Sequence, residues 1–259
     1  MPRRVRLDQL LVQRELAPSR ERARALILAG AVRVDGDRAD RAAEPVAEDA
    51  TLVVEPGPRY ASRGGEKLAG ALDSFALDVS GGIAIDVGSS TGGFTDVLLQ
   101  RGAARVIAVD VGYGQLHERL RADPRVTVLE RVNARSLTEV PFAPQLVTCD
   151  VSFISVRKAL PPVLALAAPG WQALVLVKPQ FEATRGEAAK GVVRDPEVRR
   201  RVVREVAEAA LEWGGQAAGI VDSGLPGPKG NREVFLHLVQ RERPELPPDL
   251  DERIRAAVV

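Results

Sequence analysis

Beyond residue 64 the chain alternates short, continuous apolar runs with longer stretches whose apolar residues recur every three or four positions. The apolar runs are rich in valine and isoleucine, which is typical of strands buried on both faces of a parallel sheet. The longer stretches have the period of amphipathic helices. The predicted strands cover residues 83–87, 105–110, 126–129, 146–150 and 173–178, and the predicted helices cover 94–101, 115–122, 156–167 and 196–213. This alternation predicts a doubly wound α/β domain.

Two further apolar runs close this pattern, at residues 217–221 and 233–239. The loop between them, residues 222–232, is too short for the crossover helix that a parallel pair needs. We therefore expect these two strands to pair antiparallel at one edge. The predicted fold is a mostly parallel, Rossmann-like α/β sheet with one antiparallel edge strand.

The first 58 residues carry a more compact pattern. Leu7, Leu10 and Leu11 have helical spacing. Ser19 then stands as an N-cap before a second helical stretch that stops at Gly30. The region therefore begins with two short helices.

Strand signals follow these helices. Residues 32–34 alternate into Asp35-Gly36, a typical hairpin turn pair, and residues 51–54 supply a later strand. Proline and glycine at 55–58 indicate a boundary. We predict a small α+β domain at 1–58, a linker at 59–63, the sheet domain at 64–241 and a C-terminal tail at 242–259.

Charge is concentrated in the small domain. The formal net charge of the whole chain is +1, yet residues 1–33 hold eight arginines against three acidic residues. This excess suggests an anionic partner and a phosphate-binding surface, and a solvated helix face is the alternative. The candidate arginines are Arg4, Arg6, Arg20, Arg22, Arg24 and Arg33.

Composition excludes several classes of protein. The sequence has no run of about 18 apolar residues and no apolar signal-peptide core near its start, so we expect no membrane span and a cytoplasmic location. One cysteine, Cys149, and two separated histidines, His117 and His237, provide neither a disulfide framework nor a zinc site. We therefore expect no metal.

Acidic residues stand where predicted strands end, which is where ligands bind in such sheets. Asp86, Asp110 and Asp150 hold these positions, and residues 88–94 form a glycine-rich turn that lets a ligand approach the backbone. Asp110 stands where an adenosine ribose needs an acceptor. An S-adenosylmethionine methyltransferase and an NAD-type dehydrogenase both fit this spacing, although the turn lacks the GxGxxG pattern of dehydrogenases. Aspartates that only cap helices are a third explanation.

Lysine is rare in this chain and stands at positions that suggest chemistry. Only five of the 36 basic residues are lysines. Lys178 ends the predicted strand beside that of Asp150. Lys67 lies on a helix before the first strand, and Glu233 begins the last strand. A lysine amine beside another cation can lose its proton, whereas a guanidinium cannot, so this set suits removal of a proton from an alcohol. Lysines that are only surface charges are the alternative.

Motifs along the whole chain resemble a known family. Segments 7–11, 19–23 and 27–36 resemble the small RNA-binding module of ribosomal protein S-four. The other matching motifs are SRGGEKL (62–68), DVGSSTGGFT (86–95), AVDVGYGQL (108–116), ERVNAR (130–135), DVSFIS (150–155), VKPQFE (177–182) and PGPKGN (226–231). Together they resemble the TlyA-type ribosomal RNA 2′-O-ribose methyltransferases, also called the hemolysin A family, which join such a module to an FtsJ-like methyltransferase domain.

The resemblance implies a reaction and a set of residues. The reaction is S-adenosylmethionine-dependent methylation of a cytidine 2′-hydroxyl in 16S or 23S ribosomal RNA, with ribosomal RNA or ribosomal subunits as the partner. The implied catalytic tetrad is Lys67, Asp150, Lys178 and Glu233, with Lys178 as the general base. The implied cofactor site comprises Asp86, Gly88, Ser89, Ser90, Thr91, Gly92, Gly93, Phe94, Asp110, Val111, Asn133, Ala134 and Asp150. Arg63 joins the arginines expected to bind RNA.

Other functions stay open at this point. Base methylation is disfavoured because residues 150–153 read DVSF, where amino-directed enzymes carry Asn/Asp-Pro-Pro-aromatic, and because Cys149 lies in an apolar strand. The pore-forming activity historically attached to the family would need a membrane-inserting segment. An RNA-binding protein with an inactive methyltransferase domain is a third reading. The loop 179–194 either stacks an RNA base on Phe181 or is an ordinary surface loop. The oligomeric state stays open.

Overall fold

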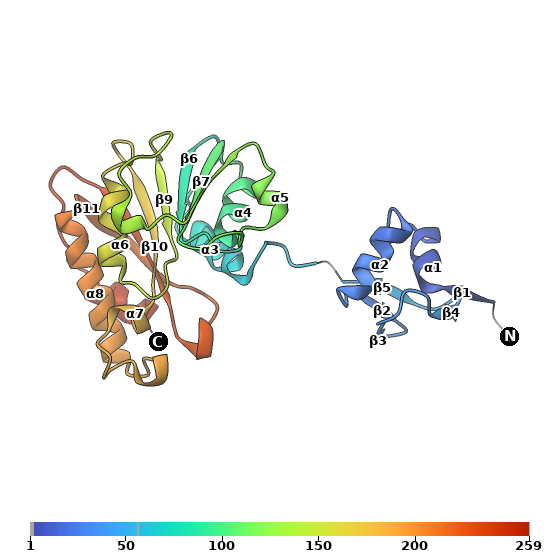
Figure 1. Cartoon of the computed structure of the whole chain (residues 1–259). Helices are drawn as coiled ribbons and strands as arrows, with labels where there is room; N and C mark the ends of the chain where they lie inside the picture. Colours follow the sequence, from blue (N-terminus) through green and yellow to red (C-terminus); the bar gives the residue numbers. More distant parts are fainter. Residues whose placement is uncertain (1–2, 56, 259) are drawn as a thin grey trace. The chain divides into compact units, whose positions relative to one another are not determined.

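The computed structural model describes residues 3–55 and 57–258. The chain divides after Arg59 into two compact units (Figure 1). The first unit holds the N-terminal helices and short strands, and the second holds the predicted sheet.

Short helices and strands form the first unit (Figure 1). These elements are β1 (Arg4–Arg6), α1 (Leu7–Gln13), α2 (Arg20–Leu28), β2 (Val32–Val34), β3 (Asp37–Arg38), β4 (Pro45–Ala47) and β5 (Leu52–Val54). Strand β1 pairs antiparallel with β4, and β2 lies between β3 and β5. Leu7, Leu11 and Ile27 are fully buried in the core of this unit.

The local signals in this unit are confirmed. Ser19 caps α2, because its Oγ accepts a hydrogen bond from the backbone N–H of Arg22 at 3.2 Å. Asp35 and Gly36 have φ values of +50° and +92°, as the turn between β2 and β3 requires. Strands β1 and β4 were missed because three residues contain too little alternation to be recognised.

A seven-stranded sheet forms the centre of the second unit. Its strands are β6 (Ile83–Val87), β7 (Arg105–Asp110), β8 (Val126–Glu130), β9 (Leu146–Cys149), β10 (Gln172–Val177), β11 (Gly215–Asp222) and β12 (Val234–Gln240). Their order is β11-β12-β10-β9-β6-β7-β8. Strands β6 to β10 pair in parallel, whereas β12 pairs antiparallel with both β10 and the edge strand β11. The predicted mostly parallel sheet with antiparallel pairing at one edge is confirmed.

The order of the strands places a switch point in the middle of the sheet. The chain runs outward from β6 to β7 and β8, and then returns to β9 on the other side of β6. The connections before and after this reversal lie on opposite faces, which opens a crevice at the carboxyl ends of β6 and β9. This crevice is the place where such a sheet binds a ligand.

Helices cover both faces of the sheet (Figure 1). They are α3 (Arg63–Ser74), α4 (Gly93–Gln100), α5 (Glu118–Arg121), α6 (Val156–Leu164), α7 (Pro179–Glu182), α8 (Pro196–Glu212) and α9 (Leu250–Ala257). Leu68 of α3 and Leu98 of α4 belong to one apolar cluster, and Leu160 of α6 and Val203 of α8 belong to the other. The two clusters are the layers expected of a doubly wound fold.

Two predictions in this unit are wrong in detail. The helix predicted at 115–122 is reduced to α5, because the N-cap His117 has a non-helical backbone conformation and its backbone N–H donates to the carbonyl oxygen of Thr91 at 3.2 Å, outside the helix. The segment 242–259 is not wholly a tail, because α9 buries Leu250 and Ile254 in the same apolar cluster as α8. Its few apolar residues among charges were too weak a signal to predict a helix.

Candidate active site

The glycine-rich loop between β6 and α4 packs tightly against its neighbours. At Gly88, with φ of +84°, an added Cβ would lie 2.6 Å from the carbonyl oxygen of Asp150. At Gly93, an added Cβ would collide with Oγ of Ser62 and lie 2.9 Å from the backbone N of Gly65. Glycine is therefore required at both positions, because the backbone itself forms the wall of the crevice.

Asp86 anchors this loop from inside the protein. It is fully buried and accepts hydrogen bonds from the N–H of Thr95 at 2.9 Å, from Oγ1 of Thr95 at 2.7 Å and from Oγ1 of Thr148 at 3.2 Å. Burial raises the pKa of the Asp86 carboxyl to about 7. Asp86 and Gly92 line neither pocket described below, although the sequence placed both in the cofactor site.

A first cavity of about 350 Å³, here named the strand-end pocket, lies at the carboxyl ends of β6, β7 and β9. Asp110 stands at its side, and its two oxygens accept hydrogen bonds from the N–H groups of Ser90 at 2.8 Å and Gly112 at 2.7 Å. The predicted cofactor residues that line this pocket are Gly88, Ser90, Asp110, Val111, Asn133, Ala134 and Asp150. Val87, Val109, Val132, Val151 and Ile154 add apolar wall that the sequence did not single out. This mixture of apolar surface with a fixed carboxylate suits a nucleoside.

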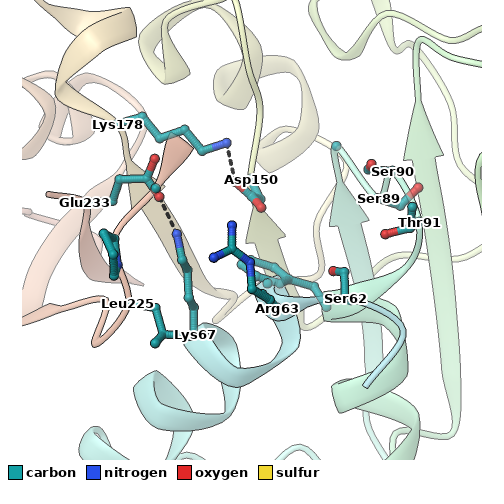
Figure 2. A pocket seen from close by; sticks show the side chains of 16 residues that line it. Ser62, Arg63, Lys67, Ser89, Ser90, Thr91, Asp150, Lys178, Leu225 and Glu233 are labelled. Carbon is teal, nitrogen blue, oxygen red and sulfur yellow. Dashed lines mark hydrogen bonds and ion pairs between the residues drawn. The ribbon is translucent and has the colours of Figure 1, made fainter. Parts of the chain in front are cut away.

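A second cavity of about 410 Å³, here named the charged pocket, is lined by the glycine-rich loop and by residues of α3 (Figure 2). Gly88, Ser90 and Asp150 line both pockets. The charged pocket also contains Ser89, Thr91, Gly93 and Phe94 of the predicted cofactor set, together with Arg63 at the start of α3. The two pockets thus adjoin each other at the three shared residues.

All four residues of the predicted tetrad line the charged pocket. Nζ of Lys178 lies 2.6 Å from Oδ1 of Asp150, and Nζ of Lys67 lies 2.6 Å from Oε2 of Glu233 (Figure 2). Lys67 comes from α3, Asp150 follows β9, Lys178 follows β10 and Glu233 precedes β12. Segments up to 166 residues apart in the chain therefore meet in two ion pairs.

Three of the four tetrad side chains are nearly enclosed by protein, whereas the Asp150 side chain is 25% exposed. Lys67 is 8% exposed, Lys178 9% and Glu233 1%. Two amines face two carboxylates, so the charges balance and no buried ion is left without a counterion. The PGPKGN loop packs against Glu233, because an added Cβ at Gly227 would collide with its carboxylate.

Two further polar side chains hold the tetrad, and the sequence had not identified them. Nε2 of Gln180 donates to Oε1 of Glu233 at 3.1 Å, and Nζ of Lys178 donates to Oγ of Ser152 at 2.9 Å. Gln180 lies within VKPQFE and Ser152 within DVSFIS, so the motifs were the only available signal.

The turn after Asp150 presents an aromatic side chain to solvent. Phe153 is 92% exposed and has φ of +63°, a conformation that is unfavourable for a bulky residue. Its ring centroid lies 5.2 Å from that of Phe181. Buried Glu182 ties the two segments together, since its carboxylate accepts from Oγ of Ser155 at 2.6 Å and from the N–H of Val156 at 2.7 Å. Backbone strain at an exposed aromatic beside a pocket is a typical feature of functional sites.

The candidate RNA-binding arginines separate into groups. Arg6, Arg20 and Arg24 all contact the carboxylate of Asp8. Arg33 instead pairs with Glu55 at 2.5 Å. Arg4 and Arg22 are exposed, and Arg63 belongs to the charged pocket of the second unit.

Other reactive side chains fit structural roles. Burial raises the pKa of the Cys149 thiol to about 12, and it lowers the pKa of His237 to about 4. His117 accepts a hydrogen bond from the N–H of Arg119 through Nδ1 at the start of α5. Within residues 3–55 and 57–258, no group of three or more His, Cys, Asp or Glu side chains is placed to hold a metal ion. In that same part of the chain, none of the helices combines the length and apolar character that a membrane crossing requires.

The fold is that of a methyltransferase domain. The solved S-adenosylmethionine-dependent methyltransferase of Mesorhizobium loti matches 68% of this chain and 98% of its own with a TM-score of 0.50 at 16% identity, a likeness of fold alone. The FtsJ-like methyltransferase family model matches residues 60–240, and the S4 domain model matches residues 5–52.

Full-length relatives give a sharper comparison. The chain is 47% identical over its whole length, and over 98% of the relative, to the 16S/23S rRNA (cytidine-2′-O)-methyltransferase TlyA of Mycobacterium tuberculosis. It is 36% identical to Hemolysin A of Brachyspira hyodysenteriae over 91% of this chain and 100% of the relative. A solved Streptococcus thermophilus protein assigned as a hemolysin matches 99% of this chain and 96% of its own, with a TM-score of 0.75 at 37% identity. The chain therefore belongs to the TlyA family of FtsJ-like methyltransferases.

Proposed function

We propose that this methyltransferase transfers the methyl group of S-adenosylmethionine to the ribose 2′-hydroxyl of a cytidine in 16S or 23S ribosomal RNA, in the cytoplasm. The observation that carries the proposal is the meeting of Lys67, Asp150, Lys178 and Glu233 in one pocket beside the glycine-rich loop. The cytidine and the ribosomal RNA come from the name of the Mycobacterium tuberculosis relative.

The residues present fit S-adenosylmethionine. Its ribose hydroxyls need a fixed acceptor at the end of the second strand, and the Asp110 carboxylate is oriented there by two backbone N–H groups. Its adenine needs an apolar slot, which Val111 and Ala134 help to line. Its methionine part needs close backbone approach, which Gly88 and Gly93 permit. When bound, the cofactor supplies an electrophilic methyl group on a sulfonium.

In this mechanism Lys178 is the general base. Its Nζ acts as the neutral amine and takes the proton of the 2′-hydroxyl as the oxygen attacks the methyl carbon in line with the sulfur leaving group, which leaves the ammonium form of Lys178 paired with Asp150. Asp150 forms an ion pair with that Nζ at 2.6 Å and Ser152 accepts a hydrogen bond from it at 2.9 Å, and the two contacts restrain its position. Lys67 stabilises the oxygen as negative charge develops on it. Glu233, held by Lys67 and Gln180, keeps the Lys67 amine in place.

The same residues favour an alcohol over a base as acceptor. A carbon-directed base methyltransferase needs a thiolate nucleophile, and the buried Cys149 thiol has its pKa raised to about 12. Phe153 and Phe181 provide an aromatic surface beside the strand-end pocket, on which a base can stack while its ribose enters the charged pocket. The arginine-rich first unit supplies contacts to the phosphates of the RNA.

The test compares methyl transfer by matched lysine variants. Purified protein is incubated with methyl-labelled S-adenosylmethionine and unmodified 16S and 23S ribosomal RNA, and mass spectrometry locates the modified nucleotide. Loss of the general base in Lys178→Ala lowers the rate about 10³-fold while calorimetry shows unchanged cofactor binding. The control, Lys158→Ala, removes an exposed lysine of α6 and leaves the rate unchanged. A wild-type rate in Lys178→Ala, or a methyl group on a base, would contradict the proposal.

A further inference from the structure

Asp8 is a fully buried carboxylate surrounded by guanidinium groups. It lies in the first turn of α1, where none of its surface is exposed. Arg6 donates to it twice, from Nε to Oδ1 and from a terminal nitrogen to Oδ2, both at 3.0 Å. Arg20 and Arg24 donate to the same Oδ2 at 3.1 Å and 3.3 Å. Three arginines from two different elements thus converge on one carboxylate.

The pairing is unequal in charge. One negative charge faces three positive ones, so the group of four residues keeps an excess of two positive charges. The hydrogen bonds from the arginines, with that from Arg6 the strongest, hold the pKa of Asp8 well below its usual range. Asp8 therefore stays ionised at any physiological pH. Within the described residues, the side chains that donate hydrogen bonds to its carboxylate are those of the three arginines.

The arginines are half-buried, in contrast to Asp8. Their side chains are 41%, 46% and 54% exposed for Arg6, Arg20 and Arg24. A guanidinium has five N–H donors, and the contacts with Asp8 use two from Arg6 and one each from the other two residues. Most of their donors thus lie outside these contacts, on a surface with excess positive charge. Such a surface matches the phosphate group, which guanidinium binds through two parallel hydrogen bonds.

We propose that Asp8 is a positioning residue that gathers Arg6, Arg20 and Arg24 into a single binding site for the phosphates of RNA. Without the carboxylate these three cations repel one another and their long side chains take many conformations, which RNA would have to order on binding. This inference rests on the proposed RNA-binding role of the first unit. It selects three of the candidate arginines and leaves out Arg33, which is held by Glu55.

A positioning role for Asp8 and a simple effect of net charge predict opposite changes in RNA affinity when the Asp8 charge is removed. Asp8→Asn keeps the shape of the side chain and adds one positive charge, so charge alone predicts tighter binding and a steeper salt dependence. The positioning role predicts binding to purified 23S ribosomal RNA about tenfold weaker at 150 mM salt, with the slope of log affinity against log salt reduced by about one phosphate contact. Filter binding over a salt series measures both quantities, below the unfolding temperature of each variant.

Matched variants separate the possible outcomes. Asp49→Asn adds the same charge at an exposed position of the first unit, and RNA binding stays equal or becomes slightly tighter. Arg6→Lys keeps the charge but loses the two-pronged contact with Asp8, and binding weakens about threefold. This variant carries the test if Asp8→Asn fails to fold, and unchanged binding by folded Arg6→Lys would then overturn the inference.

A triple variant distinguishes failure of the inference from failure of the proposed function. Replacing Arg6, Arg20 and Arg24 together by alanine lowers the affinity at least a hundredfold if these arginines bind RNA. If the triple variant loses binding while folded Asp8→Asn binds as well as the wild type or better, the positioning role is wrong and the RNA-binding role stands. If the triple variant binds normally, the RNA-binding role of these arginines is itself wrong.

Discussion

Each unit of this protein contains a cluster of cations and buried carboxylates, and the two clusters are built from different cations. In the first unit, three half-exposed arginines surround the single carboxylate of Asp8. In the second, Lys67 and Lys178 face Glu233 and Asp150 one to one, with both lysines about nine-tenths enclosed. The first cluster has excess positive charge at the surface, whereas the second is balanced in charge and mostly enclosed.

The difference shows what each cation is suited to do. A guanidinium stays charged and binds phosphate in a fixed geometry, which is what a surface for RNA requires. An amine can give up its proton in an enclosed site, which is what a general base requires. In a chain where only five of 36 basic residues are lysines, two of those lysines occupy the charged pocket.

The largest expected effect comes from exchanging the cation in the enclosed cluster. Lys178→Arg keeps the positive charge but places a group that cannot lose a proton where the base is proposed, so methyl transfer falls about 10³-fold. Cofactor binding, measured by calorimetry, stays within about twofold. Lys158→Arg on the surface of α6 is the control and keeps the full rate. Substantial activity in Lys178→Arg would show that charge, and not proton transfer, is what this position supplies.

Buried aspartates of the two units should respond to pH in opposite directions. The pKa of Asp86 is raised to about 7 by burial, so its unfolded form ionises near pH 4 while its folded form stays protonated up to about pH 7. The protonated Asp86 carboxyl therefore makes its full contribution to the free energy of unfolding below pH 4, and this contribution is lost as the pH rises to 7. For Asp8, whose pKa is lowered, the contribution is present above about pH 4 and is lost at lower pH.

Urea unfolding followed by tryptophan fluorescence measures the effect of Asp86, since both tryptophans, Trp171 and Trp213, lie in the second unit. Between pH 5 and pH 8 the wild type loses about 2.5 kcal/mol of unfolding free energy relative to Asp86→Asn. Equal pH dependence in the two proteins would mean that Asp86 is ionised in the folded state. Asp222→Asn, at the end of β11, serves as the control and follows the wild type.

Removing one charge of the Lys67–Glu233 ion pair should lower the stability of the protein. Lys67→Met leaves Glu233 buried without its cation and lowers the unfolding free energy by about 3 kcal/mol. The double variant Lys67→Met with Glu233→Gln removes both charges, keeps the contact from Gln180 and regains most of that stability, but not the methyl transfer. Urea titrations of the wild type, both single variants and the double variant give the coupling energy. Additive losses in the double variant would show that the pair does not act as a unit.

Most of the fold could be predicted from the sequence because buried parallel strands have a simple pattern. The strands at 83–87 and 105–110 were predicted with correct ends, since a run of apolar residues closed by aspartate or glycine is unambiguous. Helix α9 was missed because its stability comes from packing of Leu250 and Ile254 on other elements.

The site was less predictable than the fold. The ends of predicted strands indicated Asp150, Lys178 and Glu233, and the scarcity of lysine drew attention to Lys67 on the helix before the first strand. The pairing of each lysine with its own carboxylate had no signal in the sequence, because Lys67 and Glu233 are 166 positions apart. Asp86 was placed in the cofactor site, yet its side chain is buried behind the loop on Thr95 and Thr148, because it precedes the last residue of β6 and points into the protein.

By itself, the sequence determined the alternation of strands and helices, the two-unit composition of the chain and the family, because periodicity, turn residues and motifs are local properties. The tertiary structure alone decided which charges meet. In the folded protein Asp8 is buried at the centre of an arginine cluster. Two lysines and two carboxylates from distant segments form a set that is balanced in charge and mostly enclosed. Electrostatic energies depend on distance and solvent exposure, and both are set only when the chain folds.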